Sequence, residues 1–326
     1  MLLIWAVSLA WSVNQPFAHL DSPLHSLRTY ASRYGFPRNT AWGEGRAAGP
    51  MGLVCRWAVS FPRRVLDCLP LSLCGLDHSW GADHYLDLTS DQRRDLSQRL
   101  TPLLARHRQE ALPQYEGFLV QCRQRLERGL TDQDIDWVYT NYDRLRADLF
   151  DRIIADSGFV LASVDSRQVR TLEAALQKDH TKLTQRVQTP APERLKKRTD
   201  DIIDWLEDWL GSLSKGQEAQ IRQWSLALPD NQQFWATYQQ QSQQELLAFL
   251  RQPRTPERVA RELSALLVVY PDQTGPPAYQ DAIHQMRIAV KTMALAIDRQ
   301  VTIDQRRHAV TKLQRLINQI HDLQTE

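Results

Sequence analysis

The residues best suited to acid–base chemistry are His107, Arg108 and Glu110, which lie within four positions on one predicted helix. A histidine that a carboxylate orients can act as a general base. The sequence places no serine or cysteine nucleophile motif, glycine-rich phosphate loop or H-E-x-x-H pattern with them. We therefore expect His107 and Arg108 to bond backbone or acidic groups near Pro113, and we predict that the chain is not an enzyme. A hydrolase or transferase that uses His107 is the alternative hypothesis.

A second set of polar residues precedes the first predicted helix and has the side-chain types that bind zinc. Asp83, His84 and Asp87 offer carboxylate and imidazole ligands, with a further histidine a few positions earlier. No later stretch completes the set, so we expect neither a metal nor another cofactor. The acidic residues between Asp200 and Asp208 face several sides of a predicted helix. We expect them to form a solvated face rather than a metal site.

Composition indicates a globular helical protein. The 326 residues are 42% hydrophobic and 24% charged, which is enough apolar content to build a core. The net charge is only +2, so electrostatics gives no reason to expect nucleic acid as a partner. Only 13 residues are glycine, which favours long helices over a turn-rich β protein. Cys122 is the one cysteine in the helical part, where we expect a buried, inert thiol.

The first 75 residues differ from the rest of the chain, because they lack sustained helical periodicity and hold few acids. Leu2–Val13 is apolar like the core of a secretory signal, but no basic residue precedes it. If Met51 is the true start, arginines followed by apolar Val65–Leu73 and then Cys74 resemble a bacterial lipoprotein signal, although an acid interrupts the apolar run. Cys74 is then the candidate lipid-acceptor residue. The alternative is a misassigned N-terminus without a fold.

From Leu76 onward, apolar residues recur by threes and fours between clear helix starts and stops. We find no alternating apolar–polar run with hairpin turns, so we predict an all-α multi-helix bundle. It forms either one bundle or two lobes, residues 76–188 and 189–326, divided near Thr189–Pro192. The predicted boundaries are a kink or restart at Pro102, a break at Pro113, starts at Thr131, at Asp165 or Ser166, at Ser214, at Pro229-Asp230 and at Thr255-Pro256, a stop at Gly211, and two last helices over 278–299 and 302–323.

One short pattern recurs at several helix starts: an apolar residue, a capping residue, two variable positions and glutamine. A capping box explains it, because the capping side chain and the glutamine each bond the other's backbone N–H. The pattern also resembles the L-T-x-x-Q motif of small helical periplasmic chaperones of the stress response, but we favour capping, which follows from helix chemistry alone. The copies are Leu88–Gln92, Val164–Gln168, Leu213–Gln217 and Val301–Gln305, with Leu130–Asp134 as a relative that ends in aspartate.

Three stretches carry a resemblance: Ala82–Gln92, His107-Arg108 with Leu112-Pro113-x-Tyr115, and Trp205–Gln217. Together they resemble an uncharacterised family of bacterial helical lipoproteins, mostly from Gram-negative Proteobacteria. The resemblance covers about residue 76 to the C-terminus. The chain departs from the family pattern at Arg106, where the family has tryptophan, and at Ala111, where it has glutamate. The resemblance implies an envelope location and an all-helical body, and it supplies no mechanism.

These observations lead to one functional prediction. We expect a non-enzymatic protein of the periplasm or outer membrane that acts as an adaptor or holdase chaperone. Its partner is an envelope protein or an unfolded client, and it contacts the membrane only through a lipid on Cys74. A cytoplasmic helical structural protein is the alternative if neither signal interpretation is correct.

Overall fold

The computed structural model of the protein describes residues 85–267 and 276–325. Regular structure in these residues is α-helical without strands, which confirms the predicted all-α class. The helices are α6 (Ser90–Glu110), α7 (Leu112–Arg128), α8 (Asp132–Ala162), α9 (Ser166–Gln188), α10 (Ala191–Leu210), α11 (Lys215–Ala227), α12 (Gln232–Leu250), α13 (Pro256–Leu267), α15 (Pro277–Asp298) and α16 (Ile303–Thr325).

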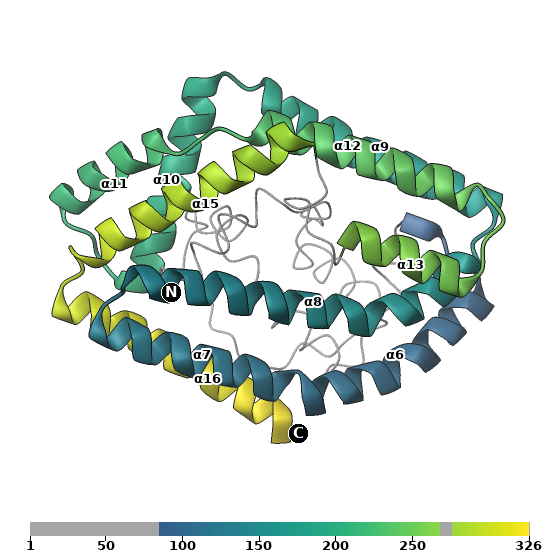
Figure 1. The fold of residues 1–326 in the computed structure, drawn as a ribbon, viewed down its shortest axis with the longest axis horizontal. Helices are drawn as coiled ribbons and strands as arrows, with labels where there is room; N and C mark the ends of the chain where they lie inside the picture. Colours follow the sequence, from purple (N-terminus) through teal and green to yellow (C-terminus); the bar gives the residue numbers. More distant parts are fainter. Residues whose placement is uncertain (1–84, 268–275, 326) are drawn as a thin grey trace, which may run out of the picture.

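Helices that are distant in sequence pack against one another throughout the molecule. Helix α8 crosses the middle, with α7 and α16 paired along one side of it and α9 and α12 paired along the other (Figure 1). Helix α13 packs on α8, and α10 packs on α11 and α16. Each of the pairs α7–α16, α8–α13 and α9–α12 joins a helix before Thr189 to one after it. The two expected lobes therefore share their packing, and their independence as folding units stays a prediction.

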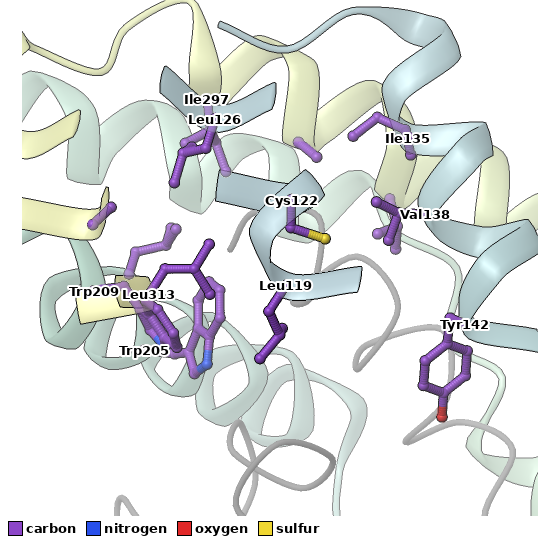
Figure 2. Close-up of a cluster of buried hydrophobic side chains, with 14 of the residues drawn as sticks. Leu119, Cys122, Leu126, Ile135, Val138, Tyr142, Trp205, Trp209, Ile297 and Leu313 are labelled. Carbon is purple, nitrogen blue, oxygen red and sulfur yellow. The ribbon is translucent and has the colours of Figure 1, made fainter. Parts of the chain in front are cut away.

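Three hydrophobic cores hold these helices together. The largest takes side chains from α7, α8, α10, α11, α15 and α16. Figure 2 shows part of it, with Leu119 and Cys122 of α7 near Trp205 and Trp209 of α10. The predicted burial of Cys122 is confirmed, and this burial raises the pKa of its thiol to about 12. A second core joins α8, α9, α12 and α13, and a small third core joins α9, α12 and α15.

The capping boxes predicted from the sequence are confirmed at the helix starts. Thr89, Thr131, Asp165 and Ser214 are N-caps, and each exchanges hydrogen bonds with the residue three positions later. Thr302 forms the same pair of bonds with the side chain and N–H of its partner glutamine. The five copies of the motif thus have one local role, which is to satisfy free N–H groups at a helix start.

Of the two alternatives predicted at Pro102, the restart is wrong, because α6 continues through this residue to Glu110, and the kink stays a prediction. The helix persists because proline removes only one N–H donor and the neighbouring Leu103 is packed in the interior. A second predicted boundary is wrong. Pro229-Asp230 does not cap α12, which begins at Gln232. The carboxylate of Asp230 instead forms an ion pair with Arg194.

The glutamines of the capping boxes also pair with one another across the fold. The side-chain amide of Gln92 donates to the oxygen of Gln168 at 3.1 Å, and Gln168 donates in return at 2.7 Å. Gln217 and Gln305 exchange the same two bonds at 2.9 and 3.1 Å. We call these reciprocal pairs the α6–α9 clasp and the α11–α16 clasp. The helix starts that they join lie at opposite ends of the long axis (Figure 1).

Each clasp glutamine makes a further bond to the chain just before the partner helix. Gln92 donates to the carbonyl of Ser163, and Gln168 donates to the carbonyl of Asp87. In the second clasp, the acceptors are the carbonyls of Gln300 and Ser212. Every acceptor lies two positions before the N-cap of the partner helix, so the two clasps have the same pattern of bonds.

Candidate functional site

The structure places His107 near the end of α6, beside the break between α6 and α7. Its ring lies 5.6 Å from the ring of Tyr115, measured between centroids. Burial, together with the nearby charge of Arg152, lowers the pKa of His107. The imidazole is therefore neutral near pH 7, the form that a general base requires.

The carboxylate expected to orient this histidine has another partner. Glu110 forms an ion pair with Arg152 of α8. The backbone carbonyl of His107 accepts the N–H of Ala111 at 2.9 Å, which is the last bond of the α6 helix. Arg108 is half-buried on the same helix. In the described geometry, His107 therefore lies beside an aromatic ring, and Glu110 pairs with an arginine rather than with the histidine. A catalytic role for His107, Arg108 and Glu110 stays a hypothesis.

The residues considered for metal binding are only partly within the described chain. Asp83, His84 and the predicted lipid acceptor Cys74 lie outside the described residues. Asp87 is exposed, and its carboxylate forms an ion pair with Arg167 of α9. Across residues 85–267 and 276–325, no three histidine, cysteine, aspartate or glutamate side chains come together as a metal site requires.

The acidic face of α10 is matched by basic side chains. Asp200 pairs with Lys196 at 3.3 Å and with Arg222 of α11 at 2.9 Å. Asp201 pairs with Lys197 at 2.9 Å. These carboxylates therefore lie on a partly solvated surface between α10 and α11, as ion-pair partners.

A feature that sequence reasoning missed is a set of exposed apolar side chains on three adjoining helices. Leu226 of α11, Phe234 of α12 and Ile288 of α15 are 59%, 45% and 46% exposed. Helix α15 packs on both α11 and α12, and the side-chain amide of Asn231 ties the turn between them to the carbonyl of Ala282 at 2.8 Å. We call Leu226, Phe234 and Ile288 the apolar edge.

The apolar edge lies apart from the core-facing positions of its helices. Ile221, Trp235 and Ile283 of the same three helices are buried. The three residues lie on helices that contact one another, and large exposed apolar side chains gathered in one region are typical of protein-binding surfaces. The signal in the sequence was the presence of Leu226 and Phe234 on either side of the Pro229 turn, but periodicity alone does not tell a binding residue from a core residue. The edge offers apolar contact area rather than acid–base chemistry.

Comparison with known proteins identifies the family. The model of a family of unknown function (DUF6279) matches residues 84–280, which is more than half of the chain, and the chain belongs to this family. The predicted membership of an uncharacterised family is confirmed over that range, whereas its lipoprotein character and bacterial origin stay predictions. No curated protein and no solved structure matches the chain. None of the helices in the described part of the chain has the length and apolar character needed to cross a membrane.

Proposed function

We propose that this member of the DUF6279 family works by binding other proteins, as an adaptor or holdase chaperone on the periplasmic side of the bacterial envelope. The apolar edge carries the proposal. Its three side chains expose apolar surface to water, whereas other apolar side chains of the same helices fill the hydrophobic cores. A partner that covers this surface removes it from water, which is the main driving force of protein association.

The small size of the apolar edge fits weak binding of many different apolar segments. Full burial of one leucine, isoleucine or phenylalanine contributes about 1.5–3 kcal/mol, and part of each edge residue is already covered. Three such residues supply only a few kcal/mol, before the cost of ordering the partner. We therefore expect about millimolar affinity of the edge alone for extended apolar segments, which suits a holdase that must release its client.

The chaperone form of the proposal has one further basis, a resemblance in sequence. Leu88–Gln92 and its copies resemble the L-T-x-x-Q motif of small periplasmic chaperones, although helix capping explains the motif here. The proposed location rests on the sequence before Cys74, where basic residues and an apolar run precede a cysteine. Intact-mass measurement of the protein from its own host tests that location. A species that begins at Cys74 and carries acyl groups is the expected result, and an unmodified protein that begins at Met1 or Met51 contradicts it.

The binding proposal is tested by the aggregation of a chemically unfolded model client in the presence of the purified chain. The wild-type protein is expected to slow aggregation, and Phe234→Ser is expected to weaken this protection several-fold. Phe159→Ser is the matched control, because Phe159 is 41% exposed but lies on α8 under the guanidinium of Arg99, 4.0 Å from its ring. Equal loss in both variants, or no protection by the wild type together with no captured envelope protein, contradicts the proposal.

A further inference from the structure

A cavity of about 240 Å³ lies between α12 and α13 and is partly open to solvent. Most of its lining comes from these two helices, and Pro276, the residue before α15, completes it. Clefts that hold drug-sized ligands measure about 300–1,000 Å³. This smaller cavity therefore fits one side chain of a partner better than it fits a whole cofactor.

The lining of the cavity combines two carboxylates with an apolar wall. Glu245 of α12 and Glu262 of α13 supply the carboxylates, and Phe249 and Leu266 belong to the wall. Glu245 accepts a hydrogen bond from the amide of Gln241 at 3.0 Å. A carboxylate binds an ammonium or guanidinium group strongly, and an apolar wall suits the hydrocarbon stem of the same side chain. The lining thus has the chemistry that recognises lysine or arginine.

The carboxylates of the cavity are not neutralised from within the described part of the chain, where neither forms an ion pair with a basic side chain. Arg258, one turn before Glu262 on α13, instead donates to the carbonyl of Pro253 at 3.2 Å and to the side chain of Gln252 at 3.1 Å. Its guanidinium is therefore bound to the loop between α12 and α13. The two negative charges remain available to a cation from outside.

The walls of the cavity are held in place by contacts on their far sides. Val259 and Leu263 are buried in the second core, which fixes α13 against α8. The ring of Tyr238, which lines the cavity from α12, stacks on Tyr279 of α15 with 4.7 Å between centroids. A cavity whose walls are already packed costs little ordering when a side chain enters it.

The cavity and the apolar edge lie on one line along α12. Phe234, Tyr238, Gln241 and Glu245 follow one another at spacings of four, three and four positions, which places them on one face of the helix. The first and last are separated by about 16 Å along the helix axis. About five residues of extended chain cover this distance.

We propose that the cavity receives a lysine or arginine side chain of the same client segment whose apolar residue covers Phe234. This inference rests on the proposed protein-binding function and names the chemistry of the partner: an extended segment with a basic residue about five positions from an apolar one. The apolar edge supplies the contact area, and Glu245 and Glu262 select the charge.

A pair of peptides tests the selection of charge. Both are extended and otherwise uncharged, with a leucine about five positions from either lysine or norleucine, which has the lysine stem without the ammonium group. Each is titrated with the full chain, and binding is followed by the NMR signals of the peptide. The wild type is expected to bind the lysine peptide about tenfold more tightly, as a charge-assisted hydrogen bond implies.

The double variant Glu245→Gln, Glu262→Gln assigns this preference to the cavity. Glutamine keeps the shape of glutamate and still accepts the bond from Gln241, but it carries no charge. We expect the preference for lysine to fall to about twofold or less, with unchanged binding of the norleucine peptide. Glu207→Gln is the matched control, because it removes an exposed charge from α10, which does not line the cavity. This control is expected to keep the full preference.

The outcomes separate the cavity from the proposed function. Equal binding of the two peptides by the wild type, or an unchanged preference in the double variant, overturns the inference. If Phe234→Ser still weakens the norleucine peptide in that case, the proposed function keeps its support. A wild-type chain that binds neither peptide contradicts the proposed function and the inference together.

Discussion

The contact between α8 and α13 gives a prediction in which the same change, glycine to alanine, has opposite effects at two positions. A Cβ atom at Gly158 of α8 would lie 2.7 Å from the carbonyl oxygen of Pro256 and 3.3 Å from Ala260, both in α13. A Cβ atom at Gly117 of α7 would meet nothing within 4 Å. Both glycines lie inside helices, so both gain the same intrinsic preference of alanine for the helix.

The magnitudes follow from these two terms. Gly117→Ala is expected to stabilise the protein by about 0.5–1 kcal/mol, because helix propensity acts alone there. At Gly158, the same gain is opposed by overpacking, which costs about 1–3 kcal/mol where the clash is with backbone rather than a flexible side chain. We therefore expect Gly158→Ala to lower the free energy of unfolding by about 1–2 kcal/mol, since α13 must move to admit the methyl group.

Urea unfolding followed by far-UV circular dichroism measures both variants against the wild type. The expected result is a higher midpoint for Gly117→Ala and a lower midpoint for Gly158→Ala. A Gly158→Ala protein as stable as the Gly117→Ala protein refutes the reasoning, because α13 then does not pack on α8 at the described distance.

Three further predictions test the polar and buried groups. Asp134→Asn is expected to cost about 1–3 kcal/mol at pH 7, and urea unfolding at several pH values is expected to show this difference fading below about pH 4. Burial alone would raise the pKa of Asp134, but hydrogen bonds from Thr131 and Arg128 lower it, so its stabilising effect is present above the unfolded-state pKa and is lost as the pH falls through the folded-state value. The thiol of Cys122, with its pKa raised by burial to about 12, is expected to resist alkylation at pH 8 until the protein is unfolded, as peptide mass mapping will show. Arg254→Met is expected to cost about 2–4 kcal/mol in a thermal or urea melt, with Arg254→Lys intermediate, because the guanidinium donates to carbonyls at the ends of both α8 and α12.

Local chemistry was enough to predict the helix starts that carry capping boxes, but not which of these starts meet. Thr89 with Gln92 and Ser214 with Gln217 form capping boxes through residues three positions apart, so the sequence contains all that the cap needs. The clasps join residues that are 76 and 88 positions apart, and no periodicity encodes that pairing. A signal was nevertheless present, because glutamine both donates and accepts hydrogen bonds whereas aspartate only accepts. The fifth motif copy ends in Asp134, and its carboxylate bonds Arg128 rather than another copy.

The candidate catalytic residues show the same limit. His107 and Glu110 are neighbours on one helix, so the sequence groups them, but Arg152 comes from 42 positions further along the chain to take the carboxylate. Asp230 is similar, because its sequence position indicates a cap, while its carboxylate pairs with Arg194, which lies 36 positions earlier in the chain. The apolar edge was missed for a related reason. Whether Phe234 faces a core or water depends on the neighbours that α15 supplies.

Site-specific photo-crosslinking tests the central claim, that the apolar edge binds protein, most directly. A photoreactive phenylalanine analogue replaces Phe234 in one sample and Phe159 in the other, so that the two probes have similar exposure on different helices. With an unfolded model client present, our account predicts strong crosslinks from position 234 and few from position 159. Equal crosslinking from both positions, or none from position 234 while client is bound, contradicts it.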